Sequence, residues 1–334
     1  MDGILVVAKA GGMTSHDVVA HIRRAAGIKR VGHAGTLDPD ATGVLVVLLG
    51  RATRAMQFML GLPKAYTAEI VLGIVTDTQD ASGTVARVAQ PDEVRVSRGR
   101  FGKVLSEYTG EILQLPPMVS AVHHEGHRLY ELARKGIEVE RAPRRVTIFE
   151  INVESWPDEP LVVGSRVAVS VVCSSGTYIR QLAADIGESL GCGAHLGSLV
   201  RTRVGPFRLS DAHTLDEIQA HASDGRLGEL VLPVAAGLSH LPAVTLSSDD
   251  ARKLSAGAPV GVLGCGPGGR ERVTIAEDGH GDGDRDGEGD WDESGPGLVR
   301  VHRDTGELIG IARVERTVEG TCLRPVRVFA RSAP

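Results

Sequence analysis

The segment Gly32–Gly43, with the sequence GHAGTLDPDATG, holds the side chain best suited to chemistry. Its three glycines allow tight turns and the close approach of a ligand to the backbone. Pro39 disfavours helical geometry at the residue before it, so we expect the Asp38 carboxylate to project from a rigid loop beside a buried strand. Such a carboxylate could act as a nucleophile. From spacing alone, an Asp-Pro turn that caps its own backbone is the commoner outcome.

Two further segments carry side chains that could complement this carboxylate. Arg180 falls in the first turn of a predicted helix after GTY, where its charge opposes the positive end of the helix dipole. That position is easier to explain if a carboxylate faces the guanidinium, although a solvated arginine is the alternative. In Lys64–Ala68, Tyr66 stands at the start of a strand and could stack on a ligand or move a proton. Packing of its ring in the core is the outcome that spacing alone favours.

Other polar patterns do not support competing chemistries. Asp38 and Asp40 could suggest a hydrolase pair, but two residues apart across a proline they need not converge. Residues 282–293 match the spacing of an EF-hand calcium loop, yet glycine-rich sequence replaces its flanking helices. The glycines of 264–269 surround a proline and precede no helix, which excludes a dinucleotide site. The histidines of 123–127 have no third ligand at a supporting spacing, so we expect neither a metal nor a cofactor.

The elements around these residues mix strands and helices. Ile4–Ala8 reads as a buried strand, and Thr14-Ser15 offers an N-cap for a helix that Gly27 would end. The composition of Arg30–Gly43 predicts a loop that leads into the very apolar strand VLVVLLG. Tyr66–Ile74 alternates like a strand, and a polar, turn-rich segment follows it.

Later in the chain the same mixture continues. Arg166–Cys173 alternates like a strand, and SSGT leads into a helix with the sequence YIRQLAADIGESLG. Regular alternation of strand, helix and strand is missing, which predicts an α+β fold rather than a doubly wound parallel sheet.

The pattern changes after about residue 238. Short alternating segments and one short helix predict a small β-rich domain over 239–334, after a first domain that spans 1–238. The Gly- and Asp-rich insert at about 264–297 lacks the apolar residues that would repay ordering, and is expected to be a disordered loop.

Composition places the chain among globular proteins that tolerate a polyanionic partner. The net charge is -5, but 277–293 alone carries nine acidic residues and one arginine, a charge of -8 whose removal leaves +3. No apolar run approaches the roughly 20 residues that span a bilayer. We find no signal peptide, and the four cysteines are widely spaced, so we expect a cytoplasmic protein.

The sequence GHAGTLDPDATGVL resembles the catalytic-loop signature of the bacterial tRNA pseudouridine-55 synthases, the TruB family. Seven further segments resemble family motifs in the same order: Lys9–Val19, Lys64–Ile70, Thr76–Gly83, Gln114–Ala121, Gly126–Gly136, Ser174–Gly187 and Gly193–Phe207. Together they extend over about two hundred residues. The resemblance implies the pseudouridine-synthase fold, with a mixed and largely antiparallel sheet, plus a C-terminal PUA-like RNA-binding domain.

The resemblance also implies a role for each matched residue. Asp38 would attack the sugar or drive glycosidic cleavage, Arg180 would pair with it, and Tyr66 would stack on the uracil and help the final deprotonation. The residues implied in substrate binding are His33, which helps to displace the base, Tyr178 and Leu199, which line the uracil pocket, and Gly35, Thr36 and Lys64. The uracil must leave its stack, be detached, turned and rejoined through carbon in a closed pocket, which fits base extrusion onto aromatic platforms.

The implied partner is the T-stem-loop of tRNA, with no obligatory protein partner, and the implied state is a monomer. Two alternatives stay open: a synthase of the same fold that acts on another RNA, and a tRNA-folding helper in which catalysis is secondary. Ala10, Val119 and His123 depart from the family pattern on the substrate side. The acidic insert would repel RNA, so we expect it to point away from the substrate.

Overall fold

The computed structural model describes residues 1–118, 123–124, 127–128, 137, 139–263, 275–276, 297–317 and 320–329. Among these residues, the larger sheet has the strand order β1-β3-β12-β4-β11-β10-β7, with β2 beside β3 and β13 beside β12. Its strands are β1 (Gly3–Lys9), β2 (Val31–His33), β3 (Thr42–Leu49), β4 (Lys64–Leu72), β7 (Gly110–Gln114), β10 (Arg144–Ser155), β11 (Arg166–Cys173), β12 (Ala194–Val204) and β13 (Phe207–Arg208). Among the described strands of this sheet, only β12 and β3 pair in parallel, which confirms the mixed, largely antiparallel sheet of an α+β fold.

Helices and short strands complete this part of the chain. The helices are α1 (Ser15–Ala26), α2 (Met56–Met59), α3 (Arg98–Glu107), α5 (Ile179–Leu190) and α6 (Leu215–Ser223), and the 3-10 helices are η1 (Gly50–Ala55), η2 (Leu209–Asp211), η3 (Leu227–Leu230) and η4 (Val234–Leu238). Two small hairpins are formed by β5 (Ile74–Thr76) with β6 (Val85–Val88), and by β8 (His123–His124) with β9 (His127–Arg128). Within the described residues, no helix is both long and apolar enough to cross a membrane.

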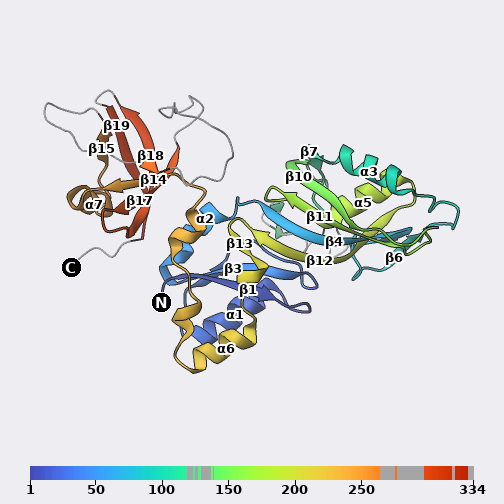
Figure 1. Cartoon of the computed structure of the whole chain (residues 1–334), viewed down its shortest axis with the longest axis horizontal. Coiled ribbons are helices and arrows are strands. Elements are labelled where there is room, and N and C mark those ends of the chain that lie inside the picture. Colours follow the sequence, from blue (N-terminus) through green and yellow to red (C-terminus); the bar gives the residue numbers. More distant parts are fainter. Residues whose placement is uncertain are drawn as a thin grey trace.

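The helices lie in two groups along the sheet. Figure 1 shows α1 and α6 beside β1 and β3, whereas α3 and α5 lie near β10 and β11. Residues of α3 and α5 share one core with β4, β10, β11 and β12. This core places the start of α5, and with it Arg180, against the strand that carries Tyr66.

Strands β1 and β3 are covered on both faces, which explains their nearly continuous apolar sequence. Leu5 and Leu45 pack with α1 and α6 on one face, while Ile4 and Val46 pack on the other face with η1 and α2. Every residue from Val44 to Leu49 has less than 1 % of its surface exposed. The loop between β2 and β3 is therefore attached to a buried strand.

The structure confirms most of the predicted elements and corrects two of them. Thr14 caps α1 in a capping box with Asp17, and Gly27 ends the helix in the left-handed conformation at φ 63°. The predicted loop Arg30–Gly43 is partly wrong, because its first residues form β2, whose backbone pairs with the end of β3. The strand predicted over Tyr66–Ile74 starts earlier and ends at Leu72, since Gly73 turns the chain at φ 80°.

The C-terminal residues form a second sheet with a core of its own. Its elements are β14 (Ala243–Leu246), α7 (Ser248–Ser255), β15 (Val260–Leu263), β16 (Ile275–Ala276), β17 (Leu298–Arg303), β18 (Leu308–Thr317) and β19 (Gly320–Val328). The strand order is β15-β19-β18-β17-β14-β16, and α7 packs its buried Ala251 and Leu254 into the core of this sheet. This confirms a β-rich C-terminal region. Of the predicted insert 264–297, nearly all lies outside the described residues.

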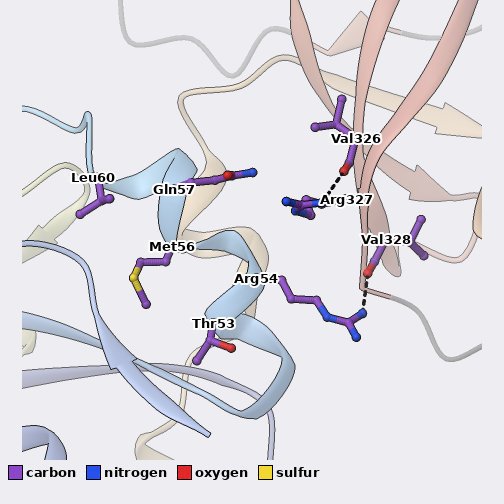
Figure 2. A pocket seen from close by; sticks show the side chains of 8 residues that line it. All are labelled: Thr53, Arg54, Met56, Gln57, Leu60, Val326, Arg327 and Val328. Atoms are coloured by element: carbon purple, nitrogen blue, oxygen red, sulfur yellow. Dashed lines mark hydrogen bonds between the residues drawn. The ribbon is translucent and has the colours of Figure 1, made fainter. Parts of the chain in front are cut away.

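The two sheets meet through apolar and polar contacts. Ile311 and Phe329 belong to the same buried cluster as Ile4 and Met59. The Arg54 guanidinium donates to the Val328 carbonyl at 3.3 Å. Figure 2 shows a cavity at this junction, with side chains of η1 and α2 on one wall and β19 on the other. It has a volume of about 570 Å³ and is lined by Thr53, Arg54, Met56, Gln57, Leu60, Val326, Arg327 and Val328.

Candidate active site

The loop that carries Asp38 is held by hydrogen bonds on the residue before it. Ser15, in the first turn of α1, accepts the Leu37 amide at 2.9 Å and donates its hydroxyl to the Leu37 carbonyl at 3.2 Å. Both residues are buried, and the Leu37 side chain packs into the core beside β4. The backbone that enters Asp38 is therefore fixed by a helix and by the sheet core.

A buried lysine holds the other side of the same loop. The Lys9 side chain, at the end of β1, donates to the carbonyls of Pro39 at 2.8 Å, Ala41 at 2.7 Å and Ala10 at 2.9 Å. Only 1 % of Lys9 is exposed. Burial lowers the pKa of Lys9, and the negative charges of Asp40 and Asp38 oppose that shift. The loop is thus anchored on both sides of Asp38.

Arg180 meets Asp38 in a two-point ion pair. Its Nε lies 2.9 Å from Oδ2 of Asp38, and its Nη2 donates to Oδ1 at 3.3 Å. Its Nη1 lies 3.5 Å from a carboxylate oxygen of Asp80 and donates to the Thr78 carbonyl at 3.2 Å. The Arg180 side chain is 5 % exposed and that of Asp38 is 43 % exposed. One buried guanidinium therefore faces two carboxylates, of which Asp38 is the more open.

The electrostatic surroundings of Asp38 act in opposite directions. The enclosing protein removes water and raises the pKa of the Asp38 carboxyl, the Arg180 charge opposes the rise, and the Asp80 charge adds to it. The contact with Arg180 favours the ionised form, which is the form that can act as a nucleophile or a base.

The start of helix α5 is held in place by a glutamine at the end of strand β7. Gln114, at the end of β7 and 2 % exposed, accepts the Tyr178 amide at 2.7 Å and donates to the Tyr178 carbonyl at 3.0 Å. Tyr178 is the N-cap of α5 and has no side-chain cap of its own. This paired contact places Tyr178 and, two residues on, Arg180.

Strand β4 supplies the floor of the site. Lys64 and Tyr66 point to the same buried side of the strand and are 6 % and 7 % exposed. The Lys64 ammonium donates to the carbonyls of Leu60 at 2.9 Å and Leu62 at 2.7 Å. Burial, followed by the positive charge of Arg201, lowers the pKa of Lys64 to about 8. Burial raises the pKa of Tyr66.

These side chains enclose a cavity of about 300 Å³, which is the size of a small-ligand site. It is lined by Gly35, Thr36, Leu37, Asp38, Leu60, Lys64, Tyr66, Ser175, Gly176, Thr177, Tyr178, Ile179, Arg180, Leu199 and Arg201. Eight of the nine residues singled out in the sequence are in this lining. A second cavity, of about 460 Å³, lies on the Asp80 side and shares Asp38, Arg180 and Leu199 with the first.

Comparison with known proteins identifies the family. Residues 23–179 match the model of the TruB family pseudouridylate synthase (N terminal domain), and residues 180–239 match that of the tRNA pseudouridylate synthase B C-terminal domain. The tRNA pseudouridine synthase B of Moorella thermoacetica is 44% identical over 330 residues, 98% of this chain and 99% of that protein. That of Symbiobacterium thermophilum is 51% identical over 254 residues, 76% of this chain and 81% of that protein. The chain belongs to the TruB family.

Solved structures agree with this TruB family assignment at the level of the fold. A chain of a Cbf5-Nop10-Gar1 complex is similar with a TM-score of 0.71 and 26% identity, covering 99% of this chain and 85% of that one. A chain of the archaeal box H/ACA sRNP Nop10-Cbf5 complex gives a TM-score of 0.70 at 24% identity, with 99% and 86% covered. With the family models, they confirm the predicted pseudouridine-synthase fold for this TruB family enzyme.

His33 is the one predicted site residue that the lining of the cavity does not include. It lies on β2, where its ring meets the ring of His16 edge-on at 5.6 Å. Burial, followed by the positive charges of His16 and Arg201, lowers the pKa of His33. Its predicted role in displacing the target base of a TruB family substrate stays a prediction.

Sequence reasoning missed several residues of this TruB family site, of which the main ones are Asp80, Gln114 and Arg201. Each lies in a segment that resembles a family motif, so the motif was the available signal. Their contacts are made to distant strands and loops, which spacing along the chain does not reveal. Across the part of the chain that the structure describes, no cluster of three metal-ligating side chains is found. The EF-hand match at 282–293 and the residue Val119 lie outside the described residues.

Proposed function

We propose that this enzyme converts uridine 55 in the T-loop of tRNA to pseudouridine, with Asp38 as the reacting carboxylate. Membership of the TruB family makes the chain a pseudouridine synthase; the target position and the residue roles are the proposal. The observation that carries it is the two-point ion pair of Asp38 with Arg180 at the wall of a 300 Å³ cavity.

The reaction moves one bond from nitrogen to carbon. The bond from the sugar C1′ to the uracil N1 breaks, the bond from C1′ to C5 forms, the proton on C5 is removed, and N1 takes up a proton. No electrons are exchanged with another molecule and no water is consumed. Asp38 either adds to C1′ or removes a proton from the sugar to give a glycal, and both routes need an ionised carboxylate. Arg180 supports this ionised form through its two contacts.

The cavity supplies the remaining roles. Tyr66 is proposed to stack on the uracil and to assist removal of the C5 proton, and Tyr178 and Leu199 to line the uracil site. Gly35, Thr36 and Lys64, which line the cavity, are proposed to bind the nucleotide. His33 is proposed to act outside the cavity, on the RNA from which the base leaves.

The proposed substrate is the T-stem-loop, bound by a monomer in the cytoplasm without an obligatory protein partner. Two relatives that cover most of this chain are named for tRNA. Similar solved chains come from Cbf5 complexes with Nop10 and Gar1, so action on another RNA with partner proteins is the second candidate. Activity on a lone T-stem-loop separates the two.

The test is a single-turnover assay on a T-stem-loop transcript, with pseudouridine mapped at nucleotide resolution. The wild-type chain alone should form pseudouridine at position 55, and Asp38→Asn should form none. Asp92→Asn, which removes an exposed carboxylate from a distant turn, is the matched control and should keep the wild-type rate. Pseudouridine formed by Asp38→Asn would show that Asp38 is not the reacting carboxylate. Product that requires added proteins would favour the second candidate.

A further inference from the structure

A fully buried arginine lies beneath the catalytic loop. Arg201, in β12, is 1 % exposed and is among the largest fully buried side chains of the described residues. Its Nε donates to the Val44 carbonyl at 2.7 Å, its Nη1 to Thr36 at 3.1 Å and its Nη2 to Gly35 at 3.0 Å. All three nitrogens of the guanidinium are thus used on backbone carbonyls, two of them in the loop that leads to Asp38.

The charge of the same guanidinium also acts on the Tyr66 phenol. The enclosing protein raises the pKa of the Tyr66 phenol, while the nearby Arg201 guanidinium lowers it. Arg201 and Tyr66 are directly opposite each other in the pairing of β12 with β4. The arginine therefore joins two parts of the site that come from different elements, the loop and the ring.

The register of the sheet explains why this position is so constrained. Arg201 is paired with Tyr66 on one side and with Gly43, at the end of the loop, on the other. A side-chain carbon on Gly43 would lie 2.2 Å from the Arg201 carbonyl oxygen, and Gly43 has a φ of 104°. β12 bulges immediately after Arg201. Such a bulge can re-aim a side chain next to an active site.

The chemistry of the side chain fits a rigid connector. A guanidinium is planar and presents its donors in a fixed fork, so carbonyls bound to different nitrogens are held at fixed relative positions. A lysine has three donors on a flexible stem and would impose no such plane. Within the cavity, Arg201 also lies 3.7 Å from the point where a side-chain carbon on Gly35 would stand.

We propose that Arg201 is a positioning residue of the isomerisation, holding the Gly35–Thr36 backbone and the Tyr66 phenol in one arrangement around the target uracil. The proposal rests on the proposed function, because it assigns the cavity to the uracil. It adds a residue that acts through the loop and through Tyr66 rather than on the reacting atoms. A purely structural arginine would support the fold without affecting the rate of folded enzyme.

The test is Arg201→Lys, which keeps the charge and removes the fork. We expect the single-turnover rate at saturating enzyme to fall about 100-fold, because small misplacements of reacting groups cost rates of this size. The dissociation constant for the T-stem-loop should stay within about twofold, since the RNA contacts are not changed. Arg203→Lys is the matched control, two residues along the same strand and outside the cavity lining, and should keep the wild-type rate.

A double-mutant cycle with Tyr66→Phe distinguishes positioning from simple support. If Arg201 acts partly through the phenol, the rate loss from Arg201→Lys should be smaller in the Tyr66→Phe background than in the wild type. Equal rate losses in both backgrounds, or a wild-type rate per folded molecule in Arg201→Lys, would overturn the proposal. This outcome differs from failure of the proposed function, in which Asp38→Asn retains activity.

A buried arginine can also be needed for folding, so a second variant is required. Arg201→Gln keeps a planar amide with donors for the loop carbonyls and removes the charge. Circular dichroism and thermal melts give the folded fraction of each variant, and rates are expressed per folded molecule. We expect at least one variant to fold and to be slow. If neither folds, even with the T-stem-loop bound, Arg201 is a folding residue and the positioning proposal is wrong.

Discussion

At the scale of single residues, the Arg180 guanidinium holds two carboxylates in the site, those of Asp38 and Asp80. Arg180 contacts Asp38 at 2.9 Å and lies 3.5 Å from Asp80. The sequence pointed to a carboxylate partner for Arg180 because an arginine at a helix start is easier to explain with one. It could not reveal Asp80 as well, since that contact depends on a turn that only the folded sheet brings near.

The second carboxylate should set the acid limit of activity. Asp38 must be ionised, so the rate falls as the pH drops through its pKa, which the surroundings raise above the ordinary value of 3.8. Asp80→Asn removes a negative charge that contributes to the rise. We expect the acid limb of the single-turnover rate to move to lower pH in this variant. An acid limb that stays at the wild-type pH, or moves to higher pH, would show that Asp80 does not raise the pKa of Asp38. Asp92→Asn is the control and should leave the acid limb unchanged.

Lys64 should make the free energy of unfolding depend on pH in the alkaline range. Its pKa is lowered from 10.5 to about 8, so the unfolded chain binds the proton more tightly than the folded chain. The free energy of unfolding is therefore lower below pH 8 and rises as the pH increases towards 10.5. Relative to Lys64→Met, wild-type unfolding free energy should rise on the order of 3 kcal/mol over this interval.

Urea denaturation of both proteins at neutral and alkaline pH measures this difference. The exposed Lys103, in α3, provides the control, because Lys103→Met should show no change with pH relative to the wild type. If the free energies of unfolding of the wild type and Lys64→Met differ by the same amount at both pH values, the Lys64 ammonium is not destabilised in the folded state.

At the scale of elements, the position of Arg180 depends on how α5 begins. Gln114 makes two hydrogen bonds to the Tyr178 backbone and is 2 % exposed. Gln114→Leu should lower the free energy of unfolding by about 2 kcal/mol, at about 1 kcal/mol for each bond. It should also lower the single-turnover rate, because Tyr178 and Arg180 lose their anchor.

Chemical denaturation and the single-turnover assay measure both effects of this change. Gln219→Leu, at an exposed position on α6, is the matched control and should change neither quantity. If Gln114→Leu is as stable and as active as the wild type, the glutamine is not needed to position α5.

The elements that the sequence predicted are those whose signals are local. The cap at Thr14, the stop at Gly27 and the alternation of Arg166–Cys173 need only neighbouring residues, and all three are present. The strand β2 was missed because its pairing partner, the end of β3, lies well over ten residues away. Arg201 was missed for the same kind of reason, since an arginine in an alternating strand reads as exposed until its neighbours are known.

At the scale of the whole molecule, the two sheets share part of their core. Figure 1 shows the C-terminal sheet on the side of α2 rather than beside the strands β10 and β7. Ile311, in β18, and Phe329, directly after β19, are buried with residues of β1 and β3. The division at residue 238 stays a prediction; the C-terminal sheet has its own buried cluster and also shares one with the larger sheet.

This shared cluster should make the two parts unfold together. Ile311→Ala removes a fully buried side chain from the junction and should cost about 2–5 kcal/mol. Because the cluster includes Ile4 and Met59, the loss should lower the melting temperature of the larger sheet as well as the smaller one. Ile137→Ala, at an isoleucine that is 46 % exposed, is the control and should have little effect.

Calorimetry of the full chain distinguishes the two cases: a single transition that shifts as a whole agrees with a shared core. A second transition that moves alone, with the activity melt unchanged, would show that the C-terminal sheet is energetically separate.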